Sequence, residues 1–220
     1  MAGGSNVILP AGGRHVTASG DTASRFVAGY FAKIRALMEG VDPNSIARAM
    51  GMLEEAWRND CQVFVIGNGG SAATASHWAC DLNKGTARPD RPRLRVISLT
   101  DNVAHFSAIA NDYGYEHVFT EQLRNLLHPG DLLVGISASG NSPNVVQAFQ
   151  FAREQGARTL AVVGFTGGTL AETADCVVHF SSHEYGPVED MQLMINHLIT
   201  DWFRSVVMAA PVGDACQPAP

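Results

Sequence analysis

The sequence lacks any apolar run that approaches the roughly 20 residues needed to cross a membrane. It also lacks an excess of positive charge, because 15 lysines and arginines stand against 21 acidic residues, and the net charge is −6 at pH 7. General nucleic-acid binders are usually basic, so direct nucleic-acid binding is not expected. The N-terminus has no basic segment followed by an apolar core. We therefore expect no secretory signal, no membrane partner and a cytoplasmic location.

Cysteine is scarce, and its spacing excludes a common kind of metal site. The four cysteines form no Cys-x-x-Cys pair, so a structural zinc knuckle is not expected. Cys61 and Cys176 stand at the edges of apolar runs and are interpreted as small core residues. Disulfides are not expected in a cytosolic protein.

The chain has the size and composition of one globular domain. Its 220 residues are long enough to bury a sizeable core, and 46% of them are hydrophobic. Residues 1–20 are Gly-rich and weakly patterned, which predicts a flexible N-terminal arm. Residues 210–220 are rich in proline and alanine, which predicts a disordered tail. The single folded domain is expected over residues 21–209.

Hydrophobic periodicity predicts two N-terminal helices followed by alternating strands and helices. Helical spacing runs from residue 22 to 38, and Asp42 followed by Pro43 predicts a second helix to about residue 58. Five continuous apolar runs follow, as is typical of strands covered on both faces. The alternation predicts an α/β fold with a doubly wound, five-stranded parallel sheet and N-terminal helices. The predicted strands are Val63–Ile66, Leu94–Leu99, Leu132–Ile136, Thr159–Val163 and Cys176–Phe180.

A glycine-rich loop follows the first predicted strand, where ligands bind in sheets of this kind. The glycines of Gly67-Asn-Gly-Gly-Ser71 permit positive φ and a close approach of a ligand. The spacing of the dinucleotide-binding motif fails at Ala72, and no Gly-Lys-Ser/Thr follows, so neither of the common nucleotide loops is present. The segment is either a loop that binds a polar ligand or a tight strand–helix turn.

A serine-rich loop, Ser137-Ala-Ser-Gly-Asn-Ser-Pro143, follows the third predicted strand. Pro143 fits the first turn of a helix, and Ser142 can cap that helix. Ser137 and Ser139, together with free backbone N–H groups, can bind a phosphate without any positive side chain. An ordinary capped turn explains the same residues, and the loop by itself leaves both interpretations open.

His77 and Asp81 form one pair of groups that could do chemistry, and the family resemblance described below adds Glu189 and His197 to a candidate metal or acid–base site. His77 and Asp81 lie one helical turn apart, and Glu189 and His197 are eight residues apart, so each pair shares a helix face approximately. Two imidazoles and two carboxylates suit zinc or another divalent ion. The competing interpretation is a structural His–Asp pair and a buried, hydrogen-bonded His197.

Taken together, these segments resemble the SIS (sugar isomerase) domain family. The serine-rich loop is general to that family, whereas Asn68-Gly-Gly-Ser71 and Asn111-Asp112 resemble its phosphoheptose isomerase subgroup. The resemblance covers about residues 22–207 and implies a flavodoxin-like SIS fold and a homotetramer. It also implies an aldose–ketose isomerase that acts on a sugar phosphate. The expected reaction converts sedoheptulose 7-phosphate to D-glycero-D-manno-heptose 7-phosphate in heptose biosynthesis.

The resemblance also implies residue roles. Asp81 and His197 would be the catalytic acid–base pair, in an order that the sequence leaves open. Zinc, or another divalent metal, would be held by His77, Asp81, Glu189 and His197. The substrate would contact Asn68, Gly69, Gly70, Ser71, Asn111, Asp112, Ser137, Ala138, Ser139, Ser142 and Glu189.

Two of these positions depart from the family pattern. The family has a glutamate where Asp81 stands, and a carboxylate that is one methylene shorter changes its reach. At position 189 the family usually has glutamine, and the negative charge of Glu189 would favour a cation.

A second function remains open at this point. Some SIS relatives are non-catalytic regulatory proteins that bind sugar phosphates or an initiator of DNA replication. This chain resembles one of them in Thr100–Val103 and Ala108–Asp112. The presence of both Asp81 and His197 favours the enzyme.

Overall fold

The computed structural model describes residues 20–210. The predicted arm over residues 1–20 and the predicted tail over residues 210–220 lie outside this range, apart from Gly20 and Ala210. The strands are β1 Gln62–Gly67, β2 Arg95–Ser98, β3 Leu132–Ser137, β4 Arg158–Val163 and β5 Cys176–His179. The α-helices are α1 Gly20–Gly40, α2 Pro43–Arg58, α3 Gly70–Cys80, α4 Val103–Asp112, α5 Thr120–Leu126, α6 Pro143–Glu154, α7 Gly168–Thr173 and α8 Tyr185–Trp202.

The five strands form one parallel sheet in the order β2-β1-β3-β4-β5, which confirms the predicted α/β fold. The chain leaves β1 toward β2 on one side and later returns to the other side of β1 as β3. The two loops at this reversal are therefore those singled out in the sequence, after β1 and after β3. Ligands of open parallel sheets bind at such a reversal, beyond the carboxyl ends of the strands.

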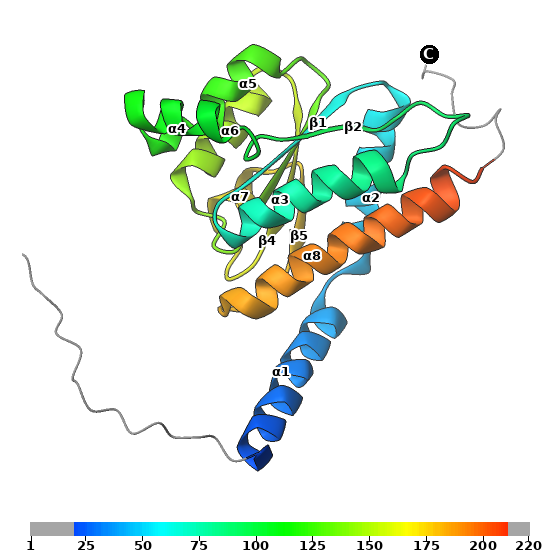
Figure 1. The fold of residues 1–220 in the computed structure, drawn as a ribbon, viewed down its shortest axis with the longest axis vertical. Coiled ribbons are helices and arrows are strands. Elements are labelled where there is room, and N and C mark those ends of the chain that lie inside the picture. The colour runs from blue at the N-terminus through cyan, green and yellow to red at the C-terminus, as the bar shows by residue number, and fades with distance from the viewer. Residues whose placement is uncertain (1–19, 211–220) are drawn as a thin grey trace, which may run out of the picture.

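Helices cover both faces of the sheet (Figure 1). One hydrophobic cluster joins the sheet to α2, α3 and α8, and the other joins it to α4, α5, α6 and α7. Successive residues of β1 face opposite layers, so Val63 and Val65 belong to the first cluster, whereas Phe64 and Ile66 belong to the second. This two-sided burial explains why the strands read as continuous apolar runs.

The second helix begins as the sequence predicts. Asp42 adopts an extended conformation at the N-cap of α2 and accepts a hydrogen bond from the Asn44 backbone N–H at 2.9 Å, and Pro43 takes the first turn. Leu53 and Trp57 on this helix are buried in the first cluster. The apolar face of α2 therefore packs on the sheet of its own chain.

The first helix, α1, projects away from the sheet and has no buried residue (Figure 1). Ile34 and Leu37 on α1 are partly buried against the first hydrophobic cluster. Two polar contacts join the helix to α8 and to the residue before it: Tyr30 donates a hydrogen bond to Asp190 at 2.5 Å, and the Lys33 ammonium lies 2.6 Å from Glu184. The hydrogen bond to the Asp190 carboxylate raises the pKa of Tyr30 to about 12, with smaller contributions from burial and nearby charge. Large apolar side chains, including Phe26 and Phe31, remain exposed on α1.

The predicted core cysteines are found where expected, Cys176 buried and Cys61 half-buried, and burial is the main cause that raises the pKa of both thiols. None of the helices within residues 20–210 has the length and apolar character needed to span a bilayer.

Candidate active site

A pocket of about 310 Å³ lies where the loops after β1 and β3 meet the start of α8. We call it the site pocket. Its lining contains nine of the eleven residues predicted to contact substrate, together with Ile136 and Tyr185. Among residues 20–210, no lysine or arginine lines it, so an anion would be held by N–H and hydroxyl groups. The lining residues are Asn68, Gly69, Gly70, Ser71, Ile136, Ser137, Ala138, Ser139, Ser142, Tyr185 and Glu189.

The serine-rich loop is shaped by its own hydroxyls. The Ser137 hydroxyl oxygen accepts a hydrogen bond from the Gly140 N–H at 3.1 Å, and Ser139 accepts one from the Asn141 N–H at 3.3 Å. Ser142 occupies the N-cap position of α6, but its side chain makes no capping hydrogen bond. The Ser142 hydroxyl therefore remains available to a ligand at the N-terminus of a three-turn helix.

The turn after β4 and the first residues of α7 pack against the serine-rich loop and hydrogen-bond to it. The Gly164 N–H donates to the Ala138 carbonyl at 3.0 Å, and the Leu170 N–H donates to the Gly140 carbonyl at 3.1 Å. The Asn141 side-chain oxygen accepts from both the N–H and the hydroxyl of Thr169. The turn after β4 thus fixes the serine-rich loop, a contribution that no sequence motif indicated.

The glycine turn brings Glu189 into the site pocket. A Cβ placed on Gly70 would lie 2.5 Å from the Glu189 carboxylate, so in this conformation the carboxylate occupies the space that the missing side chain leaves. The carboxylate lies beside the first turn of α3, where the positive end of the helix dipole favours a negative charge.

Asn111 and Asp112 are not part of the site pocket in this chain. Both are exposed at the end of α4, where the Asn111 amide donates to the Asp112 carboxylate at 2.8 Å. Tyr115, in the short helix Tyr115–His117 that follows, instead reaches the site and donates to the Asn68 side-chain oxygen at 2.9 Å. Nothing in the sequence pattern marked Tyr115.

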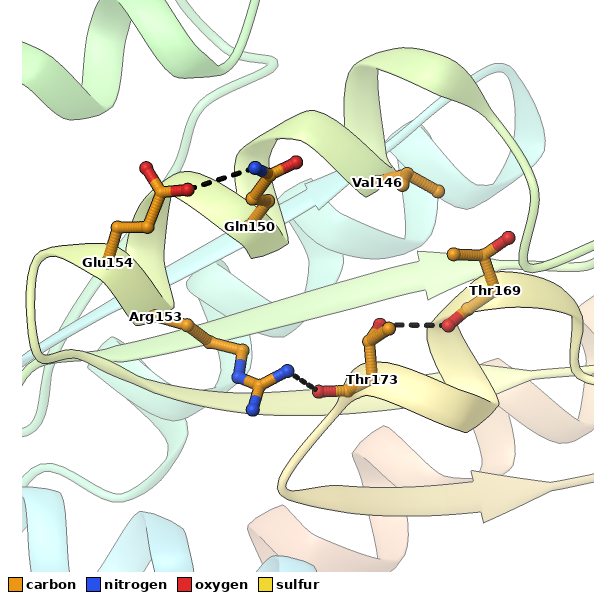
Figure 2. Close-up of a pocket in the computed structure, with 6 residues that line it drawn as sticks. All are labelled: Val146, Gln150, Arg153, Glu154, Thr169 and Thr173. Carbon is orange, nitrogen blue, oxygen red and sulfur yellow. Dashed lines mark hydrogen bonds between the residues drawn. The ribbon is translucent and has the colours of Figure 1, made fainter.

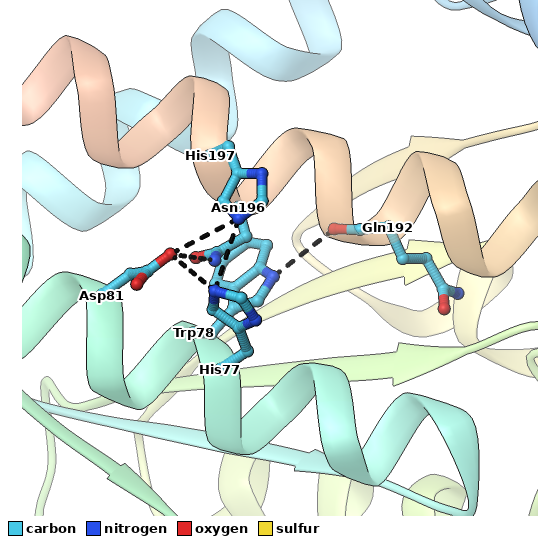
Figure 3. Close-up of polar contacts among 6 residues, drawn as sticks. All are labelled: His77, Trp78, Asp81, Gln192, Asn196 and His197. Atoms are coloured by element: carbon cyan, nitrogen blue, oxygen red, sulfur yellow. Dashed lines mark hydrogen bonds and ion pairs between the residues drawn. The ribbon is translucent and has the colours of Figure 1, made fainter.

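His77, Asp81 and His197 meet between α3 and α8 (Figure 3). We call this group the His–Asp cluster. The Nε2 of His77 lies 3.1 Å from Asp81 Oδ2, and the Nε2 of His197 lies 3.7 Å from the same oxygen and 3.4 Å from His77 Nε2. The predicted proximity of His77 and Asp81 is confirmed, and packing of α8 against α3 adds His197.

Two features fix the Asp81 carboxylate. Asp81 is the first residue of a π-helical turn, Asp81–Gly85, a local widening that is frequent at functional sites. Asn196, fully buried on α8, donates from Nδ2 to Asp81 Oδ2 at 2.8 Å (Figure 3). Asn196 was not predicted, although an amide within an apolar helix and next to His197 is a signal that could have found it.

Glu189 is not part of the His–Asp cluster, contrary to the prediction of a fourth metal ligand. Its carboxylate lies against Gly70, whereas the cluster contains only His77, Asp81 and His197. Eight residues separate Glu189 from His197, which amounts to about 12 Å along the helix axis. The helical rise therefore places Glu189 at the site pocket and His197 further along α8.

Comparison with known proteins identifies the family. A sequence profile described as the SIS domain matches residues 29–164. Phosphoheptose isomerase from Mycobacterium tuberculosis is 40% identical over 164 residues, 74% of this chain and 83% of that protein. The Sulfurimonas denitrificans phosphoheptose isomerase is 38% identical over 158 residues, 72% of this chain and 80% of that protein. The chain belongs to the phosphoheptose isomerase branch of the SIS domain family.

A solved structure agrees with this SIS assignment. Phosphoheptose isomerase from Neisseria gonorrhoeae superposes with a TM-score of 0.77 at 31% identity, covering 84% of this chain and all of that one. The loops after β1 and β3 that carry the family resemblance are those that line the site pocket.

The SIS domain has another hollow, of about 500 Å³, between α6 and α7 (Figure 2). Its polar groups bond to one another: Arg153 donates to the Thr173 carbonyl, and Gln150 donates to Glu154. Its two charged side chains, Arg153 and Glu154, are engaged in these hydrogen bonds, so we place the candidate functional site at the site pocket and the His–Asp cluster.

The His–Asp cluster has a donor set that fits a metal ion. One ligand atom from each of His77, Asp81 and His197 lies within 4.8 Å of the others. Two imidazoles and one carboxylate are a common catalytic zinc set, which leaves a fourth position for water or substrate. The side-chain oxygen of Asn196 is buried without a hydrogen-bond partner beside them, as a further polar group of this centre.

Proposed function

We propose that the protein is an aldose–ketose isomerase that converts sedoheptulose 7-phosphate to D-glycero-D-manno-heptose 7-phosphate in heptose biosynthesis. One observation carries the proposal: an anion-binding pocket and an acid–base cluster lie along the same two packed helices, α3 and α8. Relatives named phosphoheptose isomerase, which match most of the chain, support the same reaction.

The spacing of these two features suits a long sugar phosphate. Gly70 at the site pocket and His77 in the cluster are seven residues apart on α3, or about 10 Å along the axis. An open-chain heptose has six carbon–carbon bonds of about 1.5 Å each, so its phosphate and its carbonyl end can reach both features together.

We assign the phosphate to the serine-rich loop. Ser137, Ser139 and Ser142, with the backbone N–H groups at the start of α6, would bind the phosphate oxygens. Residues 68–71 would contact the sugar between the phosphate and the cluster. Ala138 would line the same pocket, and Glu189 would accept hydrogen bonds from sugar hydroxyls.

We assign the proton transfers to Asp81 and His197. Isomerisation takes a proton from C1 of the ketose and returns a proton to C2, while a second proton moves between the two oxygens. A general base and a general acid must lie within hydrogen-bond reach of these atoms. Asp81 and His197, which lie 3.7 Å apart in the cluster, can take these two roles. Asn196 would hold Asp81 in place during the transfers.

The cluster residues His77, Asp81 and His197 would also hold zinc or another divalent ion. When bound, such an ion polarises the carbonyl and stabilises negative charge on the substrate oxygens.

The test is an NMR time course of purified protein with sedoheptulose 7-phosphate, after metal removal and after zinc loading. We expect the aldose product to appear, and Asp81→Asn and His197→Ala to slow its formation by about 100-fold or more. His128→Ala, at the opposite end of the sheet, is the matched control and should keep wild-type turnover. No product from either metal form would refute the isomerase, and binding without turnover would favour the regulatory alternative.

We further propose that the protein forms a homotetramer in the cytoplasm, with α1 at a subunit interface. Phe26 and Phe31 are 75% and 64% exposed on this helix, which has no buried residue in the single chain. Apolar area of this kind favours association. Light scattering at micromolar concentration should give four times the chain mass, and Phe26→Ser with Phe31→Ser should lower it.

A further inference from the structure

Asn68 stands at the centre of a hydrogen-bond network that the assignments above do not use. It follows β1 directly and lines the site pocket. It also lines an adjoining hollow of about 570 Å³, together with Tyr115 and Asn144. Tyr115 and Asn144 come from different parts of the chain, the short helix after α4 and the first turn of α6.

The orientation of the Asn144 amide is fixed by the backbone. Its side-chain oxygen accepts a hydrogen bond from the Val145 N–H at 3.0 Å. A backbone N–H can only donate, so this atom must be oxygen, and the Asn144 nitrogen must occupy the other position. Asn144 is 1% exposed, and water cannot substitute for its partners.

The fixed Asn144 amide in turn fixes Asn68. The Asn144 Nδ2 donates to Asn68 Oδ1 at 2.9 Å, and the Asn68 Nδ2 donates to Asn144 Oδ1 at 2.9 Å. The Tyr115 hydroxyl donates to the same Asn68 Oδ1 at 2.9 Å. The Tyr115 ring is held in turn by an edge-to-face contact with Phe106 at 5.8 Å.

The hydrogen bonds already made by the Asn68 side chain determine which further bonds it can form with a ligand. A side-chain carbonyl oxygen accepts two hydrogen bonds, and Asn68 Oδ1 already accepts two. The side-chain nitrogen has two N–H groups and uses one, for Asn144. One N–H is therefore left for a ligand, and the side chain cannot act as an acceptor.

We infer that Tyr115 and Asn144 are positioning residues that make the Asn68 side chain a pure hydrogen-bond donor toward the substrate. The group that it recognises is an oxygen acceptor of the sugar between the phosphate and the carbonyl end. A donor that is already held in place needs no reorganisation when the substrate binds. This inference rests on the proposed isomerase function.

The chain provides a matched control in Tyr113, two residues from Tyr115. Tyr113 is 65% exposed, and its hydroxyl makes no hydrogen bond within the described part of the chain. Tyr115→Phe and Tyr113→Phe each remove one phenolic oxygen, but only the first removes a bond to Asn68.

The experiment measures kcat and KM for sedoheptulose 7-phosphate in both tyrosine variants, each in the wild-type and the Asn68→Ala background. Loss of one such hydrogen bond is expected to lower kcat/KM by about 10-fold in Tyr115→Phe. Tyr113→Phe should stay within about 2-fold of wild type. In the Asn68→Ala background Tyr115→Phe should have no further effect, because coupled residues are not additive.

Wild-type kcat/KM in Tyr115→Phe, or the same loss with and without Asn68, would overturn the inference. A second readout does not depend on turnover: the side-chain amide NMR signals of Asn68 should shift in Tyr115→Phe and not in Tyr113→Phe. If the wild-type protein shows no isomerase activity, the proposed function fails, and the amide signals alone then test whether Tyr115 positions Asn68. Unchanged Asn68 signals in Tyr115→Phe would refute this positioning role.

Discussion

Replacing Gly140 with alanine tests whether the serine-rich loop depends on its contact with the turn after β4. Gly140 has φ = +66°, a conformation that costs an L-residue about 1–2 kcal/mol. An added Cβ would also lie 1.9 Å from the Gly167 carbonyl oxygen, which belongs to backbone and cannot rotate away. Real Cβ atoms essentially never approach closer than 3.0 Å, so one loop must move by about 1 Å.

Gly156→Ala separates the cost of the positive φ from the cost of the clash between the two loops. Gly156 has φ = +80°, but a Cβ there would meet Pro129 at an ordinary 3.5 Å, far from the serine-rich loop. For a domain of this size, about 1–2 kcal/mol lowers Tm by roughly 2–8 °C, which we expect for this control. Its isomerase kinetics should be unchanged.

Gly140→Ala should lose more stability than the control and, in addition, its activity. A displacement of about 1 Å at a substrate-positioning loop lowers the rate by about 100-fold. Thermal unfolding followed by circular dichroism and kcat/KM for sedoheptulose 7-phosphate measure the two effects. Equal Tm values for both variants, with Gly140→Ala retaining kcat/KM within about 3-fold, would show that the contact between the loops does not matter.

Other predictions follow from single contacts. Ser142→Ala should raise KM by about 10-fold without lowering Tm, because its hydroxyl makes no capping bond, whereas Ser137→Ala should also lower Tm by a few degrees. Asn196→Ala frees the Asp81 carboxylate and should weaken zinc affinity by about 10- to 100-fold in a chelator competition, and unchanged affinity would argue against this support. The neutral Tyr30 phenol binds α8, and its pKa is raised to about 12, so its stabilising contribution is complete below pH 10 and is lost as the pH rises to about 12. Absorbance of the phenolate in wild type against Tyr30→Phe checks this, and titration of that signal near pH 10 would contradict it.

The two groups of predicted site residues that the structure brings together have a common origin in local sequence. The residues that line the site pocket follow β1 and β3 directly, and parallel strands bring such loops to one edge of the sheet whatever the detailed packing. His77 and Asp81 are joined by one helical turn, so their approach to 3.1 Å also needs no tertiary information.

The structure differs from the expected arrangement at residues whose position depends on distant contacts. Asn111 and Asp112 follow a family pattern, but the end of α4 leaves them exposed and brings Tyr115 to Asn68 instead. Glu189 shares a helix with His197, yet the helical rise and the space above Gly70 place it in the site pocket.

The sequence alone therefore determined the sheet, the helices that cover it, the position of the two loops after β1 and β3, and the family. These follow from the periodicity of apolar residues and from turn chemistry, which act over a few residues. Only the tertiary structure decided which polar groups meet: His197 and Asn196 with Asp81, and Tyr115 and Asn144 with Asn68. Hydrogen bonds form over about 3 Å. The packing of α3 against α8, and of the α4–α5 region against α6, sets such distances, and no local pattern in the sequence records it.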